Sequence, residues 1–207
     1  MEDFKMREAT FYEKVGDNVV KCNLCSHRCK ITDLNRGICA VRENRNGTLC
    51  SLVYGKVVAR AVDPIEKKPL FHFLPGSRAY SIATVGCNFR CDNCQNFDIS
   101  QMPKDRKMIL GQDASPDEIV RAAKRDNCES IAYTYTEPAV FFEYAYDTAK
   151  LASKEGIKNV FVTNGYITEE ALVEIKPYLD AANIDLKSFS EDFYRKNCGA
   201  RLEPVLD

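Results

Sequence analysis

The sequence predicts a mixed α/β protein, in which about four βα units of a parallel sheet or barrel follow a small cysteine-rich β region that binds metal. From residue 79 onward, strand-like apolar runs alternate with helix-like stretches, which is typical of parallel α/β sheets. A loop with three closely spaced cysteines follows the first of these runs, and a second cysteine group lies near the N-terminus. We therefore expect two regions, residues 1–78 and residues 79–207.

The composition is that of an ordinary globular protein, with 207 residues, 45% hydrophobic and 29% charged. A net charge of -1 gives no extended field for nucleic acid or an anionic membrane, so neither is an expected partner. The charged N-terminus lacks the apolar run of a secretory signal, and no apolar stretch reaches the length of a membrane span. We therefore expect a cytoplasmic protein whose clustered cysteines bind metal rather than form disulfides.

The first region carries Cys22, Cys25, Cys29 and Cys39 in the spacing C-x2-C-x3-C-x9-C. So short a segment lacks an apolar core of its own, and a bound metal would supply its folding energy. Zinc in a tetrahedral four-cysteine site is the plain interpretation. A second Fe-S cluster is the alternative, because C-x2-C-x3-C is also a cluster-like spacing. Thiols without metal are the third interpretation.

The next stretch of the chain is expected to connect the two regions. Residues 49–62 carry β-branched side chains on both sides of Gly55 and predict a hairpin that packs the metal region onto the barrel. Prolines then interrupt regular structure, so residues 63–77 are expected to link the two regions.

The central motif consists of Cys87, Cys91 and Cys94, directly after a buried strand that includes Ser81. Gaps of three and two residues let one loop offer three thiolates to one face of a 4Fe-4S cluster. One iron would then have no protein ligand, and such an open iron can bind a substrate or a cofactor. A zinc site and ordinary buried thiols are the alternatives.

The second region shows the signals of successive βα units. Strands are expected to begin near residues 81, 130, 159 and 182. Ser115 is an expected N-cap with Glu118 as its capping-box partner, and a proline occupies the first helical position. Pro138 opens a long helix that Gly156 closes, and Thr168 caps the next helix.

Polar residues follow three of these strands. Glu137 follows the second strand, Asn164 the third, and Asp185 and Lys187 the fourth. Ligands of α/β folds bind at the carboxyl ends of the strands, so these residues are candidates for a cofactor site. Each also has an ordinary interpretation, as a helix N-terminal charge, an Asn-Gly turn or an ion pair on one strand face.

The C-x3-C-x2-C loop after the first strand resembles that of the radical S-adenosylmethionine (SAM) superfamily. Residues 67–77, 85–91 and 94–96 are similar, more narrowly, to the radical SAM enzyme of the AmmeMemoRadiSam system, a relative of the pyruvate formate-lyase activating enzymes. The resemblance implies a radical SAM barrel of the (β/α)6 type, related to the TIM barrel. It covers the whole chain, which would supply the N-terminal portion of that barrel.

The resemblance also implies a site. A 4Fe-4S cluster on Cys87, Cys91 and Cys94 would bind SAM, and Glu137 would accept hydrogen bonds from the SAM ammonium group. Polar groups that reach the ribose and the carboxylate of SAM would come from Asn164, Asp185 and Lys187. One departure is Asn93, which stands where an aromatic residue commonly lies near the SAM adenine.

The implied reaction is reductive cleavage of SAM to a 5′-deoxyadenosyl radical, which takes a hydrogen atom from a substrate that the sequence does not identify. Implied partners are an electron donor such as flavodoxin or ferredoxin, together with Memo-like and AMMECR-like proteins. The first alternative is a glycyl-radical activase, although Pro75-Gly76-Ser77-Arg78 departs from the Gly-Pro-Gly-x-Arg-like segment of those enzymes. A zinc-binding protein-interaction module is the alternative of another class.

Overall fold

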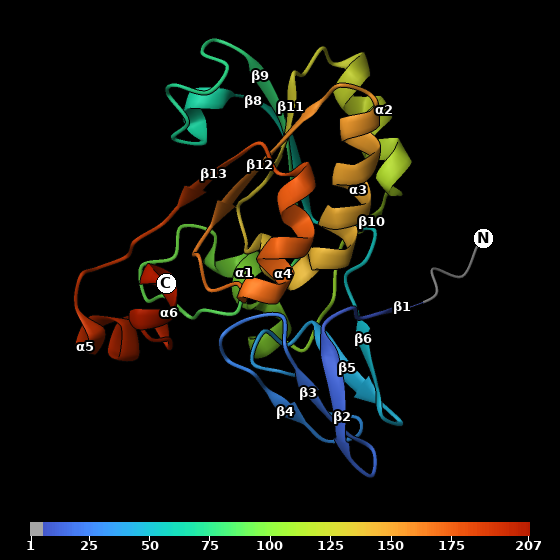
Figure 1. Cartoon of the computed structure of the whole chain (residues 1–207), viewed down its shortest axis with the longest axis vertical. Coiled ribbons are helices and arrows are strands. Elements are labelled where there is room, and N and C mark those ends of the chain that lie inside the picture. Colours follow the sequence, from blue (N-terminus) through green and yellow to red (C-terminus); the bar gives the residue numbers. More distant parts are fainter. Residues whose placement is uncertain (1–5) are drawn as a thin grey trace.

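The structure, a computed structural model, describes residues 6–207. Short antiparallel strands lie at one end of the molecule, and a mainly parallel sheet with its helices lies at the other (Figure 1). The fold is thus the predicted mixed α/β fold with a partial parallel sheet. Within residues 6–207, no helix is long and apolar enough to cross a membrane.

Six short strands build the N-terminal part and pair as two antiparallel sheets, in the orders β1-β6-β5 and β2-β3-β4. Their bounds are β1 Arg7–Glu8, β2 Tyr12–Gly16, β3 Val19–Cys22, β4 Lys30–Ile31, β5 Arg42–Arg45 and β6 Thr48–Ser51. Burial alternates along β3, where Val20 and Cys22 turn into the core. Strand alternation thus fixes which face of this sheet meets the rest of the protein.

The hairpin predicted across Gly55 is wrong. Strand β6 pairs with β1 and β5, whereas β7 (Lys56–Val57) pairs with β10 (Gln112–Asp113). Strand β8 (Ala59–Pro64) pairs antiparallel with the first strand of the main sheet. Gly55, at φ 71°, turns the chain out of one sheet, so the β-branched residues around it serve separate sheets. The predicted boundary after residue 78 falls at the first residue of β9 (Arg78–Ala83), the strand that pairs with β8, and the division into two domains stays a prediction.

The main sheet has five strands in the order β13-β12-β11-β9-β8. Its four parallel strands are β9 Arg78–Ala83, β11 Ser130–Tyr133, β12 Lys158–Thr163 and β13 Ala181–Ile184. These starts lie within three residues of the predicted ones, which confirms the expected succession of strands. Within residues 6–207, the five strands of the main sheet form an open sheet rather than a closed barrel.

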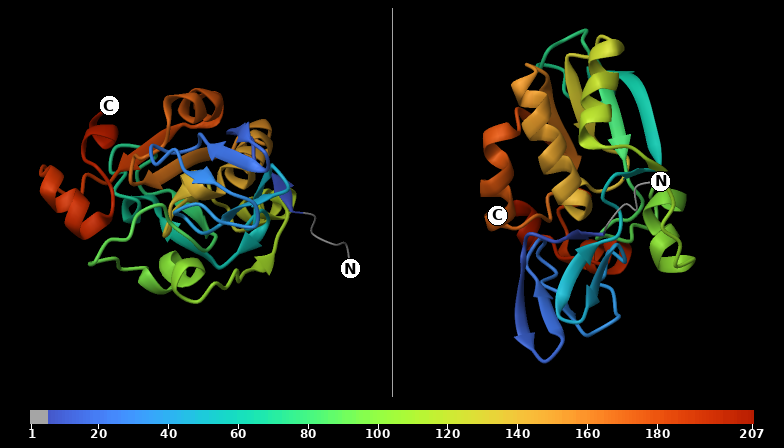
Figure 2. Two further views of the ribbon diagram at one scale, coloured as in Figure 1. Left: turned by 90° about the horizontal axis from the view of Figure 1, so that it is seen from below. Right: turned by 90° about the vertical axis from the view of Figure 1, so that its right-hand side faces the viewer.

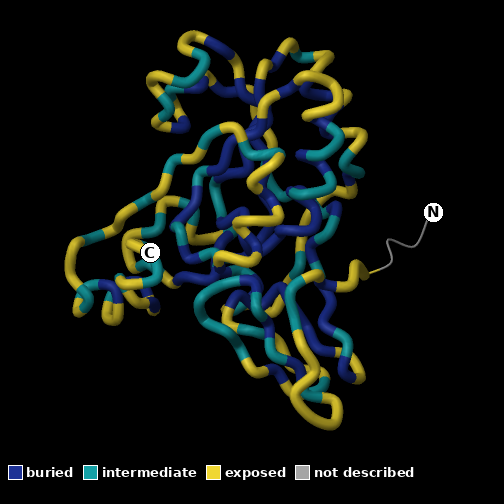
Figure 3. The backbone as a smooth tube through the Cα atoms, viewed as in Figure 1, coloured by how far each residue is buried: buried dark blue, intermediate teal, exposed yellow. Residues whose placement is uncertain are grey.

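Helices connect the parallel strands. The α-helices are α1 Phe97–Asp105, α2 Pro116–Arg125, α3 Phe142–Lys154, α4 Glu169–Ile175, α5 Glu191–Phe193 and α6 Glu203–Leu206. Short 3-10 turns span Ile65–Lys67, Pro138–Phe141 and Lys176–Tyr178, and a π-helical turn spans Tyr194–Cys198. Helices α2 and α3 pack on each other and on one face of the sheet (Figure 2). Buried chain therefore concentrates between sheet and helices (Figure 3).

The predicted helix starts hold with two changes, at Pro138 and at Thr168. Ser115 and Glu118 form both halves of the capping box of α2. Pro138 opens a 3-10 turn that leads into α3. Thr168 occupies the N-cap position of α4, but its hydroxyl donates to the carbonyls of Asn23 and Leu24 at 2.8 and 3.2 Å instead of capping the helix. This side chain therefore joins the loop after β12 to the N-terminal part.

A buried ion pair fixes the N-terminal part against α3. Nη2 of Arg42 lies 2.5 Å from Oε2 of Glu143, and both side chains are at most 3% exposed. The other oxygen of Glu143 accepts the backbone N–H of Thr10 at 2.9 Å. One carboxylate thus holds β5 and the segment after β1 on the helix.

Replacing Glu143 by Ala is expected to lower the free energy of unfolding by about 3–5 kcal/mol, because the buried Arg42 charge would lose its partner. Chemical denaturation followed by circular dichroism measures this change. Glu155→Ala, which breaks the exposed pair with Lys124, is the control and should cost at most about 1 kcal/mol. Equal losses in the two variants would contradict the role of the buried pair.

Candidate active site

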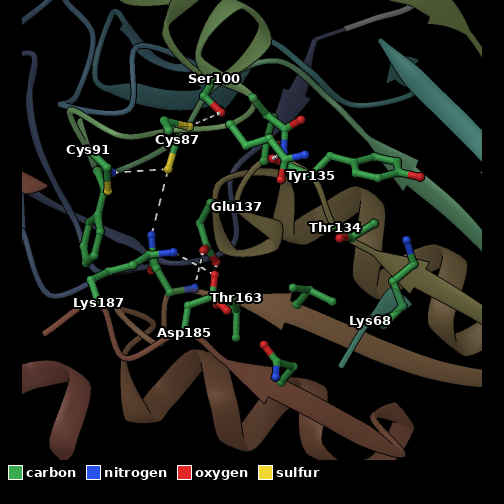
Figure 4. A pocket seen from close by; sticks show the side chains of 18 of the residues that line it. Lys68, Cys87, Cys91, Ser100, Thr134, Tyr135, Glu137, Thr163, Asp185 and Lys187 are labelled. Carbon is green, nitrogen blue, oxygen red and sulfur yellow. Dashed lines mark hydrogen bonds and ion pairs between the residues drawn. The ribbon is translucent and has the colours of Figure 1, made fainter. Parts of the chain in front are cut away.

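A cavity of about 700 Å³ lies at the carboxyl ends of the parallel strands. The cysteine loop, the ends of β11, β12 and β13, and the connector before β9 line it. Every sequence-predicted residue of the second region borders this cavity, namely Cys87, Cys91, Cys94, Glu137, Asn164, Asp185 and Lys187. In the close view, Cys87 and Cys91 lie on one side and Lys68 lies on the other (Figure 4). The cavity thus brings together residues from all the strand ends singled out by the sequence.

The cysteine loop is anchored by Phe89, whose ring is buried against Tyr166 and Tyr194 at centroid distances of 5.1 and 6.1 Å. Nε2 of Gln101 and Nζ of Lys104 donate to its carbonyl at 3.0 and 2.8 Å. The loop can therefore hold its thiols in place without a bound group.

Gly86 lets this loop start close to the N-terminal part. Its φ is 103°, and a Cβ at this position would lie 2.5 Å from Cγ1 of Val41. Only glycine fits here without movement of its neighbour.

The three thiols that follow are half-buried, and burial raises the pKa of both Cys87 and Cys91 to about 12. Cys87 and Cys91 are therefore protonated until a bound cation displaces their protons.

Glu137 is the buried acid of the cavity, with 1% of its side chain exposed. Its Oε1 accepts the hydroxyl of Thr163 at 2.7 Å and the N–H of Ala139 at 3.0 Å, and Oε2 accepts the N–H of Asn164 at 2.8 Å. Burial raises the pKa of Glu137, although these three hydrogen bonds oppose the rise. Because a carboxylate oxygen accepts two hydrogen bonds, Oε2 keeps one acceptor position for a ligand.

Asn164 links the end of β12 to the cysteine loop. Its Nδ2 donates to Oδ1 of Asn88 at 2.7 Å and lies 3.9 Å from Sγ of Cys87. The carbonyl of Asn88 meets Nε2 of His27 at 2.9 Å, so the N-terminal part also reaches this contact. Nδ2 of Asn88 is buried and has no hydrogen-bond partner among the described residues, which leaves a donor beside the cavity.

Asp185 and Lys187 lie at the end of β13 and pair with each other at 2.7 Å. The backbone N–H of Lys187 donates to Oη of Tyr194 at 3.0 Å, which fixes the strand end. Burial opposes the charged ammonium, but Asp185 outweighs it and the pKa of Lys187 is raised. Lys187 therefore carries its positive charge where it borders the cavity.

Sequence reasoning missed an acid that lies behind the far wall of the cavity. Asp63 accepts hydrogen bonds from Lys67 at 2.8 Å, Lys68 at 2.7 Å and Ser81 at 2.8 Å, and from the hydroxyl of Tyr135. Nζ of Lys68 also lies 4.6 Å from the centroid of the Tyr135 ring. Both lysines and Tyr135 line the cavity. The adjacent lysines were the available signal, but their partner comes from β8 and could not be located without the fold.

Asp63 is expected to make the protein sensitive to acid. Burial would raise the pKa of Asp63, but hydrogen bonds from Lys67, Lys68, Tyr135 and Ser81 lower it below its usual value. Its stabilising contribution is therefore complete above the ordinary carboxyl pKa of about 4 and is lost as the pH falls below that value. The free energy of unfolding should fall less steeply below about pH 4 in Asp63→Asn than in the wild type.

Urea titrations between pH 2 and 7 measure this slope, with pH values chosen from the ordinary carboxyl range. The matched control is Asp192→Asn, which removes an exposed carboxylate paired with Lys196 and should leave the wild-type slope. A wild-type slope in Asp63→Asn would show that other groups govern the acid transition.

The other cysteine group lines a separate small cavity of about 20 Å³, which borders Cys22, Cys25, Cys29 and Cys39. Across residues 6–207, no group of three or more His, Cys, Asp or Glu side chains is arranged so that it could hold a metal ion. A cubane cluster is larger than a single ion, and its thiolates lie further apart. This observation therefore leaves open a cluster on the 87–94 loop.

The donor set of the large cavity fits a 4Fe-4S cluster with a bound SAM. Three thiols from one loop border a space that also offers the buried carboxylate of Glu137 and the ion pair of Asp185 and Lys187. The fold and the site together define an α/β protein with a thiol-lined cofactor cavity at the carboxyl edge of its sheet.

The sequence profile of the Radical SAM superfamily matches residues 81–207, which is more than half of the chain. The chain belongs to the radical SAM superfamily. Members of this superfamily are generally enzymes, and membership implies a 4Fe-4S cluster and SAM.

Several curated and solved proteins are similar to this chain. Uncharacterized protein MJ0808 of Methanocaldococcus jannaschii is 52% identical over 202 residues, covering 98% of this chain and 59% of that protein. Uncharacterized protein MJ0674 of the same organism is 28% identical over 93% of this chain and 52% of that protein. The chain thus spans little more than half the length of these two relatives.

More distant similarities lie within characterised proteins. The 4-hydroxyphenylacetate decarboxylase activating enzyme of Clostridium scatologenes is 23% identical over 122 residues, covering 56% of this chain and 39% of that protein. A structure of TYW1 with a lysine-pyruvate adduct bound has a TM-score of 0.46 and 19% identity, over 68% of this chain and 53% of that chain.

Proposed function

We propose that this protein is a radical SAM enzyme whose cluster is held by Cys87, Cys91 and Cys94. The observation that carries the proposal is that these three thiols share one 700 Å³ cavity with the buried carboxylate of Glu137. Three cysteine ligands leave one iron of a 4Fe-4S cluster for SAM. When bound, the cluster and SAM supply a 5′-deoxyadenosyl radical for hydrogen abstraction from the substrate.

The residues of the chain would position SAM and exclude water. Oε2 of Glu137 would accept the ammonium group, since it keeps an acceptor position and its other contacts fix its orientation. Asn164 and Asn88 offer amide groups between this acid and Cys87. Lys187 would attract the SAM carboxylate, and Asp185 would accept the hydroxyls of the ribose.

Lys67 and Lys68 border the same cavity through the connector that resembles the AmmeMemoRadiSam enzyme. This resemblance supports Memo-like and AMMECR-like proteins as partners, with a flavodoxin or ferredoxin as the electron donor. The similarity to an activating enzyme from Clostridium scatologenes supports glycyl-radical activation as the alternative activity. Mixing the reduced protein with each class of partner separately distinguishes the two activities, because only an activase would give a stable glycyl-radical EPR signal on its target.

The test is anaerobic reconstitution with iron and sulfide, followed by EPR of the dithionite-reduced protein with and without SAM. The expected result is a 4Fe-4S signal that changes when SAM is added, with 5′-deoxyadenosine and methionine formed in equal amounts. A cluster signal that SAM leaves unchanged would overturn SAM binding at an open iron. Zinc without iron would favour a zinc-binding interaction module.

A further inference from the structure

The N-terminal cysteines converge on one point of the fold although they come from three segments. Cys22 ends β3, Cys29 directly precedes β4, and Cys39 lies in the loop before β5. The N–H of Cys22 donates to the carbonyl of Cys29 at 2.9 Å, and the N–H of Arg28 closes a turn onto the carbonyl of Cys25 at 3.0 Å. All four sulfur-bearing side chains therefore border the same 20 Å³ cavity.

The size of this cavity favours a small occupant. A space of about 10–15 Å³ admits one water-sized sphere, so the 20 Å³ between these side chains is closer in size to a single ion than to an eight-atom cubane. The backbone of Gly37 lies close to the cavity wall, because a Cβ at this position would lie 3.6 Å from Sγ of Cys29 and 3.2 Å from Cδ1 of Ile31. Four sulfur ligands around one small divalent ion are the arrangement of structural zinc.

Arg42 supplies an independent observation. Its side chain is 1% exposed, borders the same cavity, and uses only Nη2 for the pair with Glu143. Nε and Nη1 are buried and have no hydrogen-bond partner in the part of the chain that the structure describes. Each such donor costs about 1–3 kcal/mol unless a ligand or solvent accepts from it. Cys22 and Cys39 border this cavity together with the Arg42 side chain.

We propose that Cys22, Cys25, Cys29 and Cys39 bind one zinc ion as thiolates, and that Nε and Nη1 of Arg42 donate N–H···S hydrogen bonds to those sulfurs. In the described residues the four side chains are not yet arranged to hold an ion, so binding must turn them inward onto it, and it releases the four thiol protons to solvent. Four thiolates and Zn²⁺ carry a net charge of -2, which the Arg42 cation offsets in part. The site thereby gives acceptors to Nε and Nη1 of the buried Arg42 side chain, which its pair with Glu143 leaves without a partner.

The ion would stabilise the contacts that join the cysteine segment to the active site. The N–H of Ser26 donates to the carbonyl of Tyr166 at 3.0 Å, and the N–H of Thr168 donates to that of Leu24 at 3.1 Å. His27, between two of the ligands, meets the carbonyl of Asn88, whose side chain contacts Asn164. Zinc is therefore expected to order the Asn88-Asn164 contact beside Cys87 without touching SAM.

Metal analysis of the full chain, purified without added metal, tests this proposal. One zinc per chain is expected, and Co²⁺ in its place should give the absorption bands of tetrahedral thiolate coordination. Cys25→Ala and Cys39→Ala should lose the metal, whereas Cys50→Ala, a buried cysteine of β6 that does not border the cavity, should keep it. The variant with Cys87, Cys91 and Cys94 all replaced by Ala should also keep its zinc, so this outcome does not depend on the radical cluster.

Arg42→Lys tests the donor role separately, because it keeps the charge beside Glu143 and removes the forked donors. Competition with a chelator should show zinc affinity reduced by about 10–100-fold in a variant that remains folded by circular dichroism. Wild-type affinity in this variant would overturn the role of Arg42. Iron and sulfide at the site, or no metal in the wild type and no Co²⁺ bands on titration, would overturn the zinc site itself.

Discussion

Cys91→Ala is expected to abolish SAM cleavage, with a rate at least about 10⁴-fold below that of the wild type, because the cofactor supplies the reaction. The loss should accompany loss of the 4Fe-4S EPR signal, since two thiolates remain on the loop. Quantifying 5′-deoxyadenosine by chromatography and iron by absorption after anaerobic reconstitution measures both effects.

The control for this substitution is Cys128→Ala, a buried cysteine outside the cavity, which should keep both the cluster and the activity. Cys198 is a direct neighbour of Cys91, and the N–H of Arg90 donates to its carbonyl at 2.9 Å. Retained iron in Cys91→Ala would therefore point to Cys198 as a ligand, and full activity would contradict the proposed cluster.

Glu137→Gln is expected to weaken SAM binding by about 10–150-fold, which corresponds to the loss of one charge-assisted hydrogen bond of about 1.5–3 kcal/mol. The amide cannot accept at both ends, so one of the donors from Thr163, Ala139 or Asn164 would also face an NH₂ group. Titrating SAM into the reconstituted protein and following the change in the EPR signal gives the affinity.

Iron content should remain at the wild-type level in Glu137→Gln, because the acid does not ligate the cluster. Glu129→Gln, at an exposed position before β11, is the matched control and should bind SAM normally. If Glu137→Gln keeps both its iron and its SAM affinity, the carboxylate serves only to cap the turn that begins at Pro138.

Local signals were sufficient for the regular elements. Strand alternation and the Ser115 capping box need only neighbouring residues, so the four parallel strands and α2 could be located from the sequence. The candidates after the strands could be predicted together because the carboxyl ends of parallel strands meet at one edge. That edge holds the cavity, although the individual roles of Glu137, Asn164 and Lys187 stay predictions.

Contacts between distant segments could not be predicted in this way. The β-branched residues around Gly55 satisfy two sheets, and which strands they join depends on partners such as β9 and β10. Asp63 meets Tyr135 across 72 residues, and Arg42 meets Glu143 across 101. A single sequence carries no local mark of such pairs, so these buried polar contacts appeared only with the fold.

The hydrogen bond from Thr168 to Asn23 spans 145 residues and has a consequence for biosynthesis. The cysteine segment leaves the ribosome before the loop that contacts it, which follows 145 residues later. At about 5–20 residues per second, that interval lasts many seconds, during which the thiols stay accessible to metals and oxidants. Delivery of the correct ion during this interval, rather than after folding, would then decide how many molecules become competent.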